Sequence, residues 1–140
     1  MLRYVLLLIL SLAAPHHLAA QDQEQGDFSI CSGSGRITCV VDGDTIWYRG
    51  DKIRISDINT PEVSRPSCAY EAELGERATN RLLALLNEGP FTLEREGRDL
   101  DRYGRQLRII RRDGRSLGDV LVEEGLAEIW QGRRGDWCAS

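Results

Sequence analysis

Short runs of apolar and β-branched residues, separated by turns rich in glycine and aspartate, follow residue 35. The runs cover residues 36–41, 45–49 and 52–58, and Asp42-Gly43-Asp44 and Arg49-Gly50-Asp51 lie between them. Runs of this kind favour strands, and glycine beside aspartate favours the tight turns that join antiparallel neighbours. The pattern therefore predicts a meander of three antiparallel strands.

A helical pattern follows at residues 69–87, after Pro61 and Pro66 have ended the strand pattern. Apolar residues recur there at spacings of three and four, which places them on one face of a helix. They are Leu74, Ala78, Leu82, Leu85 and Leu86. Gly89-Pro90 ends the helix. Gly75 lies inside it and costs about 1 kcal/mol relative to alanine.

Two further strands and a second helix are predicted in the second half of the chain. Residues 91–96 and 105–111 predict two strands, and a second helix begins after Ser116 and ends at Gly125. Residues 126–130 predict a last extended segment. Three strands, a helix, two strands and a helix predict an α+β domain, mainly β: a five-stranded Greek-key barrel of the OB type. One helix follows the third strand and the other follows the fifth.

The first twenty residues have the pattern of a secretory signal peptide. Arg3 precedes an apolar run at residues 4–14, and Leu18-Ala19-Ala20 ends in small residues. The run is shorter than the roughly 20 residues of a membrane span, although an uncleaved anchor is the alternative. We expect a secreted or periplasmic protein with no membrane contact after cleavage. The expected organisation is a signal peptide at 1–20, a flexible lead-in at 21–35, a domain at 36–130 and a tail at 131–140.

The charge of the chain excludes a strongly basic nucleic-acid-binding protein. The net charge is −4, and removal of residues 1–20 takes away Arg3 but no acid, which leaves 17 basic and 22 acidic side chains and a net charge of −5. Any affinity for phosphate must therefore come from local patches or from a metal ion.

Four cysteines lie after residue 20, at Cys31, Cys39, Cys68 and Cys138. An even number in a small secreted domain favours two disulfides, for which three pairings are possible. We favour Cys31–Cys39 because the two are close in sequence, and Cys68–Cys138 because it would hold the tail. The four show no CxxC spacing typical of a zinc site, and the two histidines lie within residues 1–20.

Charged side chains cluster at predicted turns and strand ends, in Asp42-Gly43-Asp44-Thr45, Thr60-Pro61-Glu62 and Asp101-Arg102-Tyr103-Gly104-Arg105. Carboxylates can hold a divalent cation, and arginine can bind phosphate through paired charged hydrogen bonds. Arg54 alternates with Ile53 and Ile55 and therefore faces away from them. This combination is typical of phosphodiester chemistry, although each segment alone also fits an ordinary turn or a solvated charge.

The order and spacing of these segments resemble the staphylococcal nuclease (thermonuclease) family over residues 36–130. The resemblance implies that Glu62 is the general base that activates a water and that Arg54 and Arg105 hold the phosphate. It further implies a Ca²⁺ ion held by Asp44, Asn59 and the Thr60 carbonyl. Tyr103 would form a hydrogen bond near the nucleotide phosphate, with packing as its alternative role.

Two departures from the family pattern change the expectation. Asn59 stands where the family carries an aspartate ligand, so the site loses one negative charge, which Asp57 could partly replace. We therefore expect weaker metal binding than the family norm, or a different cation preference. The nucleotide-stacking tyrosines are also missing after the second helix. Trp130 could stack on a base and Arg133 and Arg134 could meet phosphates, or all three could serve packing and solvation.

These features predict a monomeric, metal-dependent endonuclease for DNA or RNA. It would show little sequence preference because it reads phosphates rather than bases. If the chain follows the family, it breaks the 5′ ester bond and leaves 3′-phosphate products. The alternative is a domain with weakened catalysis that binds nucleic acid or protein, which Asn59 and the acidic charge favour. Adhesion through the two Arg-Gly-Asp tripeptides, at 49–51 and 134–136, is a third class.

Overall fold

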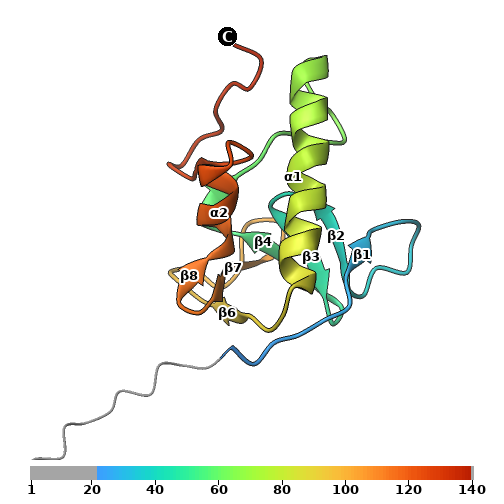
Figure 1. Ribbon diagram of the computed structural model, residues 1–140, viewed down its shortest axis with the longest axis vertical. Coiled ribbons are helices and arrows are strands. Elements are labelled where there is room, and N and C mark those ends of the chain that lie inside the picture. The colour runs from blue at the N-terminus through green and yellow to red at the C-terminus, as the bar shows by residue number, and fades with distance from the viewer. Residues whose placement is uncertain (1–21, 140) are drawn as a thin grey trace, which may run out of the picture.

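The computed structural model describes residues 22–139, so the expected signal peptide at 1–20 lies outside the described residues. Two helices pack over a set of short strands (Figure 1). In chain order the elements are β1 (Ser29–Ile30), β2 (Cys39–Asp42), β3 (Thr45–Tyr48), β4 (Asp51–Ile55), β5 (Ile58–Asn59), α1 (Ala69–Asn87), β6 (Thr92–Glu94), β7 (Gln106–Arg112), β8 (Arg115–Ser116), α2 (Leu117–Glu123) and β9 (Glu128–Ile129).

The main sheet is mixed and has the strand order β1-β2-β3-β4-β7-β6, with β8 paired to β7. Strands β2, β3 and β4 form the predicted antiparallel meander, with Ile46 opposite Ile53. Strands β4 and β7 are parallel, with Arg54 opposite Leu107. The prediction of an α+β domain made mainly of strands is confirmed. The pairings within residues 22–139 form an open path, so closure into a barrel stays a prediction.

The predicted third strand is two strands in the structure. Strand β4 ends at Ile55, and after Ser56 and Asp57 the chain enters β5, which pairs with β9 instead of the main sheet. The Ile55 N–H donates to the Asp44 carbonyl, and the Ser56 N–H donates to the Arg108 carbonyl. This break places residues 58 and 59 opposite residues 129 and 128, near the C-terminus.

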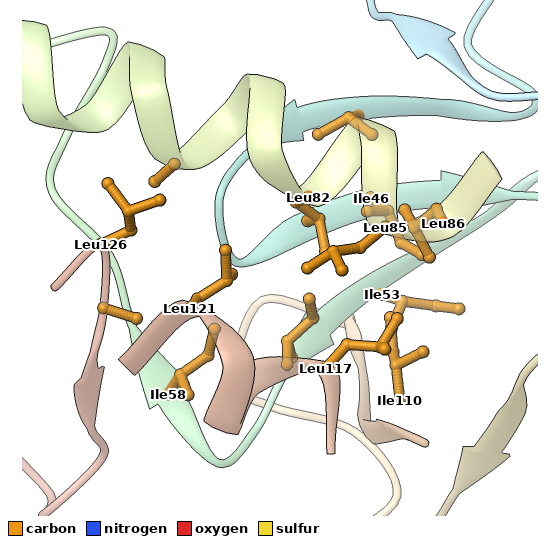
Figure 2. Close-up of a cluster of buried hydrophobic side chains, with 14 of the residues drawn as sticks. Ile46, Ile53, Ile58, Leu82, Leu85, Leu86, Ile110, Leu117, Leu121 and Leu126 are labelled. Carbon is orange, nitrogen blue, oxygen red and sulfur yellow. The ribbon is translucent and has the colours of Figure 1, made fainter. Parts of the chain in front are cut away.

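The core lies between the two helices and the inner face of the sheet. Helix α1 has the predicted bounds, and Ser116 caps α2 as predicted by accepting from the N–H groups of Gly118 and Asp119. In Figure 2 the apolar side chains of both helices converge on those of the strands. The fully buried members include Ile46, Ile53, Leu82, Leu86, Ile110 and Leu121. Burial of each such side chain stabilises the fold by about 1.5–3 kcal/mol.

The N-terminal segment differs from the flexible lead-in that we expected at residues 21–35. Strand β1 pairs in parallel with β2, and Glu24 forms a bridge with Phe91. Phe28 is buried in the core, where its ring stacks on Tyr48. Asn87 accepts from the Phe28 N–H and donates to its carbonyl. These contacts form between distant parts of the chain, which explains why local patterning did not indicate them.

Two disulfides join Cys31 to Cys39 and Cys68 to Cys138, which is the pairing that we favoured. Cys68 also caps α1, and its bond to Cys138 brings the C-terminal tail to the N-terminal end of that helix (Figure 1). Among residues 22–139, no helix has the length and apolar character that a membrane crossing requires.

Candidate active site

The turn between β2 and β3 brings two carboxylates close together. Asp42 ends β2, Asp44 directly precedes β3, and Asp42 Oδ1 accepts a hydrogen bond of 3.1 Å from the Asp44 N–H. Gly43 allows this turn to lie against α1 and the loop after β5. A Cβ atom at Gly43 would lie 2.8 Å from Ala78 Cβ and 2.8 Å from Thr60 Cγ2. The glycine is therefore needed for a close approach between chain segments.

Asp44 is 7% exposed, and its oxygens bind different parts of the fold. Its Oδ1 accepts from the Thr45 hydroxyl at 3.1 Å. Its Oδ2 accepts from the Thr60 N–H at 2.9 Å and lies 3.3 Å from Arg54 Nη2. Asp44 therefore connects β3, β4 and the loop that follows β5, and it brings three of the predicted site residues together.

Arg54 is held within the protein, because only 12% of its side chain is exposed. Its Nη1 donates to the carbonyls of Ile55 and Ile58, the second at 2.9 Å. The Trp130 ring centre lies 5.9 Å from the guanidinium carbon, within the range of a cation–π contact. These contacts fix the guanidinium next to Asp44. The alternative of an ordinary solvated arginine does not describe this side chain.

Asp42 and Asp44 form a pair of like charges with little access to water. Burial, and then the negative charge of Asp44, raises the pKa of Asp42 to about 7. A divalent cation would relieve the repulsion between two such carboxylates. Residues 22–139 contain no group of three or more His, Cys, Asp or Glu residues arranged for a metal ion. A cation at this pair would therefore also need amide, hydroxyl or carbonyl oxygens.

Thr60 is buried beside this pair, and Asn59, the residue before it, is buried as well. Asn59 Nδ2 donates to Glu128 Oε1 at 2.9 Å, so its amide oxygen is the atom left for a cation. Thr60 Oγ1 is buried and has no hydrogen-bond partner among the described residues, which indicates that a water or another polar group belongs beside it. Two carboxylates and a hydroxyl oxygen near them are ligands of the kind that a hard cation such as Ca²⁺ prefers.

Asp57 does not lie with these groups, in contrast to our expectation that it could replace the charge missing at residue 59. Its Oδ2 accepts from the Ser116 hydroxyl at 2.6 Å, next to the N-terminus of α2. Burial raises the pKa of Asp57, and the hydrogen bond from Ser116 opposes this shift. The expectation assumed one continuous strand through residue 58, whereas the chain changes direction between β4 and β5.

The loop that carries Glu62 rests on α1. Glu71 is buried in the first turn of the helix, and its two carboxylate oxygens accept from the N–H groups of Glu62 at 3.3 Å and Ser67 at 2.7 Å. Gly75 lies directly beneath the loop, because a Cβ there would lie 2.9 Å from the Pro61 carbonyl oxygen and 3.0 Å from that of Glu62. The glycine that costs helix propensity thus permits α1 to support the Glu62 backbone.

The Glu62 carboxylate forms an ion pair with the C-terminal tail. Its Oε1 contacts Nη1 of Arg134, whose side chain is 65% exposed, and 32% of the Glu62 side chain is exposed. The Glu62 carboxylate is thus accessible at the surface, as a general base for water must be. The contact joins two residues that lie 72 positions apart in the sequence.

Arg105 and Tyr103 lie in a compact loop before β7. Asp101 Oδ1 accepts from the N–H groups of Tyr103 and Arg105, and Asp101 Oδ2 accepts from Arg105 Nε at 2.6 Å. Burial raises the pKa of Asp101, but the hydrogen bonds from Arg105 outweigh this effect and hold the pKa below its ordinary value. The Arg105 guanidinium carbon lies 5.4 Å from the centre of the Tyr103 ring, which is 67% exposed.

The strand register relates the two predicted phosphate-binding arginines. Arg54 on β4 pairs with Leu107 on the parallel strand β7, and Arg105 lies two residues before Leu107. Paired residues point to the same face of a sheet, as do residues two apart on one strand. Arg54 therefore projects from the face opposite to the core face of Ile53 and Ile55, and Arg105 lies in the loop directly before the neighbouring strand β7. Trp130, 39% exposed, lies beside Arg54 on this side.

Three acidic or basic residues beyond the predicted set have a part in the geometry of the site: Glu71, Glu128 and Arg134. Their partners lie 9, 69 and 72 positions away in the sequence. The sequence indicated Arg134 as a possible phosphate contact, and the position of Glu71 in the first turn of the predicted helix, where acids favour the helix N-terminus, gave a local signal for it. Glu128 had no such signal.

Comparisons with known proteins find a family and several relatives to which this chain is similar. A model of the family described as "Staphylococcal nuclease homologue" matches residues 52–136. The SPbeta prophage-derived endonuclease YokF of Bacillus subtilis (strain 168) is 40% identical over 94 residues, which is 64% of this chain and 31% of the relative. Endonuclease YncB of the same strain is 38% identical over 94 residues, 64% of this chain and 44% of the relative.

Thermonuclease of Staphylococcus hyicus is 29% identical over 96 residues, which is 66% of this chain and 56% of the relative. The chain thus spans between about a third and somewhat over half of the length of these relatives. The family match covers more than half of the chain, from β4 through β9 and into the tail, and includes Arg54, Glu62 and Arg105. The chain therefore belongs to the staphylococcal nuclease family.

Proposed function

We propose that this protein is an endonuclease that hydrolyses phosphodiester bonds of DNA and RNA with little sequence preference. The observation that carries the proposal is the buried contact of Asp44 with Arg54 and with the loop before Glu62, on a strand that neighbours the one Arg105 precedes. The endonuclease names of two relatives support the same reaction class. Contacts to phosphates carry no information about the bases, so cleavage would show little dependence on the substrate sequence.

In this proposal Glu62 takes a proton from the attacking water, and Arg54 and Arg105 bind the oxygens of the scissile phosphate. Negative charge grows on those oxygens during attack, and fixed guanidinium groups stabilise it without reorganising. Asp101 and the contacts to the carbonyls of Ile55 and Ile58 hold the two guanidinium groups in place before the substrate arrives. Tyr103 and Trp130 lie exposed beside the arginines, where a phosphate or a base can meet them.

The residues that would hold a Ca²⁺ ion are Asp44, Asn59 and Thr60, to which the geometry adds Asp42. When bound, the ion would supply a positive charge that stabilises the charge developing on the phosphate. The raised pKa of Asp42 and the unpartnered Thr60 hydroxyl oxygen support a cation in this position. The calcium dependence that is typical of the family is thus part of the proposal.

The test is hydrolysis of single-stranded DNA by the oxidised chain 21–140, with calcium and with a chelator, beside the variant Glu62→Gln. Calcium-dependent cleavage that is lost in Glu62→Gln supports the enzyme and its base. A folded protein that binds DNA but does not cleave it, whichever divalent cation is added, would support the second candidate, a binding domain with weakened catalysis. Asn59 is the observation that favours that candidate.

We further propose that the protein acts as a secreted or periplasmic monomer after removal of residues 1–20. The two disulfides support an oxidising compartment, because cytosolic thiols are kept reduced. Fractionation of the producing cells with N-terminal sequencing tests the compartment and the cleavage point, and gel filtration tests the monomer. The family resemblance also supports closure of the sheet into an OB-type barrel, which an experimental structure would test.

A further inference from the structure

Residues 131–138 form a segment, here called the strap, that returns from β9 to the N-terminal end of α1 (Figure 1). Its residues through position 136 are exposed, and this part contains no helix or strand. A segment of this kind would leave the surface unless specific contacts held it. Two contacts do so, at Gly135 and at Cys138, which both follow Arg134 in the chain.

The first anchor is Glu128. Its Oε1 accepts from Asn59 Nδ2 at 2.9 Å and from the Gly135 N–H at 2.6 Å, so a single carboxylate oxygen joins the predicted cation ligand to the strap. The strap passes so close that a Cβ atom at residue 135 would overlap Glu128 Oε2. Gly135 directly follows Arg134, so this contact also restricts the position of the Arg134 backbone.

The second anchor is the disulfide between Cys138 and Cys68 at the cap of α1. The Cys138 sulfur lies 3.7 Å from Glu71 Oε2, and the other oxygen of Glu71 binds the Glu62 backbone. Asp136 Oδ1 closes a turn by accepting from the N–H groups of Cys138 and Ala139. The strap is therefore attached to the same helix end that supports the Glu62 loop.

Arg134 directly precedes the first attached residue, Gly135, and its Nη1 lies on the Glu62 carboxylate. An exposed ion pair contributes only about 0–1 kcal/mol, so this pair alone would not hold the strap, and its loss would not release it. The side chains of Arg54 and Arg105 are 12% and 23% exposed and bound to Asp44 and Asp101, whereas that of Arg134 is 65% exposed. Of the three arginines, Arg134 is the most accessible to an approaching polyanion.

We propose that Arg134 is a third phosphate-binding arginine of the site, delivered by the strap; this inference rests on the proposed nuclease function. A guanidinium has five N–H donors, and the contact with Glu62 uses one nitrogen. The guanidinium moves from Glu62 to a phosphate oxygen of the bound strand, so substrate binding frees Glu62 Oε1 for the attacking water. No bond is made or broken in this exchange, and Glu62 keeps its charge. The disulfide keeps Arg134 within reach of both partners.

The test compares Arg134→Gln with Arg77→Gln in the oxidised chain 21–140. Arg77 is exposed on α1 and has no ion pair among the described residues, so its variant controls for the loss of one positive charge. We expect Arg134→Gln to lower kcat/KM for single-stranded DNA by about 10–100-fold, the value of one charged hydrogen bond. Arg77→Gln should stay within about twofold, the range of an exposed charge. Equal effects of the two variants, or a higher kcat in Arg134→Gln, would overturn the proposal.

Binding provides a measurement that does not depend on cleavage. Fluorescence anisotropy with a labelled single-stranded oligonucleotide in chelator gives Kd as a function of salt. Loss of one phosphate contact should reduce the slope of log Kd against log salt by about 0.7 in Arg134→Gln and leave it unchanged in Arg77→Gln. A wild type that does not cleave DNA would refute the nuclease function, whereas an unchanged slope would refute the role of Arg134.

The strap itself is tested with the paired variant Cys68→Ser, Cys138→Ser, compared at a temperature where circular dichroism shows the folded state. Release of the strap should lower kcat/KM to the level of Arg134→Gln, and adding Arg134→Gln to the paired variant should cause no further loss. Independent, multiplicative losses would show that Arg134 acts without the strap and would overturn this part of the proposal.

Discussion

Replacing Asn59 with aspartate would restore the family's ligand charge, but it would also remove the hydrogen bond that holds Glu128. Asn59 Nδ2 is the donor and Glu128 Oε1 the acceptor, at 2.9 Å, in a largely buried position. A carboxylate cannot donate, so Asn59→Asp places two acceptors of like charge against each other. Loss of a hydrogen bond to a charged group costs about 1.5–3 kcal/mol. Repulsion of two charges about 4 Å apart adds up to about 4 kcal/mol at an effective dielectric constant near 20, before relaxation.

We therefore expect Asn59→Asp to lower the free energy of unfolding by about 2–4 kcal/mol in chelator at pH 7. Protonation of either carboxyl group in the folded state would relieve the repulsion between them. Their stabilising protonation is thus present at low pH and is lost as the pH rises toward 7. The deficit of the variant should accordingly shrink toward pH 4. Urea unfolding followed by circular dichroism at both pH values measures it.

The double variant Asn59→Asp, Glu128→Gln is the matched control. A glutamine at residue 128 can place its NH₂ group where Oε1 now lies and donate to the new carboxylate. The Gly135 N–H would then bind the remaining oxygen, because Oε2 also lies against Gly135, so stability should largely return. Calcium titration of the same proteins measures the effect of residue 59 on calcium affinity separately from its effect on stability. Each tenfold gain in affinity corresponds to about 1.4 kcal/mol of binding free energy. A variant as stable as the wild type in chelator, with no rescue by Glu128→Gln, would refute the anchor. Calcium binding unchanged by Asn59→Asp would refute residue 59 as a ligand position.

Three further predictions concern single groups. Because the pKa of Asp42 is raised to about 7 from 3.8, its contribution to stability is full below about pH 4 and is lost as the pH rises through 7. In chelator, Asp42→Asn should therefore be more stable than the wild type at pH 8, by at most about 4 kcal/mol, and equally stable at pH 3.5. A difference in stability that does not change with pH would contradict this reasoning. Gly75→Ala should lower Tm and kcat despite better helix propensity, because its Cβ would meet the Pro61 carbonyl at 2.9 Å; a higher Tm with full activity would contradict it. Arg105→Lys should lower kcat/KM by at least about tenfold, because lysine lacks the planar fork that binds Asp101 and phosphate, and steady-state kinetics with wild-type activity would disprove this role.

Local patterning predicted the elements whose determinants lie within a few residues of each other. Helix α1 has its predicted bounds because an apolar stripe, a cap at Cys68 and Gly89-Pro90 all lie on or beside it. Helix α2 begins after Ser116 for the same reason, since the serine accepts from N–H groups two and three residues ahead. The three meander strands are likewise separated by turns that glycine and aspartate specify locally.

Elements that depend on distant partners were not predictable in this way. Strand β1 has two residues and becomes a strand only through its pairing with β2, and Phe28 is buried only because Tyr48 and Phe91 surround it. The position of Asp57 was misjudged because a pattern of period two assumes an unbroken strand. In the structure the chain leaves the sheet after Ile55, and the Asp57 carboxylate binds Ser116 on another element.

The same distinction between local patterns and distant contacts applies to the candidate site. Asp44, Arg54, Glu62 and Arg105 were found from residue type and spacing, whereas the groups that hold them in place depend on the fold. Glu71 supports Glu62 from helix α1, nine positions further along the chain. Asp101 is the exception, because it orients Arg105 from within the same motif. A sequence motif therefore specifies which side chains are present, but contacts between segments determine their orientation and exposure.

Asn59 and the strap are best understood as one adaptation. An aspartate at residue 59 would add ligand charge, but it would repel Glu128, which holds Gly135 and with it Arg134. The amide of Asn59 adds no negative charge at the proposed cation site. It binds Glu128, which holds the strap, and the strap places the positive charge of Arg134 at Glu62. Both changes make the site less negative toward a phosphate. If this reasoning is right, Asn59→Asp should weaken DNA binding in chelator together with stability, and Glu128→Gln should restore both. Restoration of stability without binding would mean that the strap and residue 59 act separately.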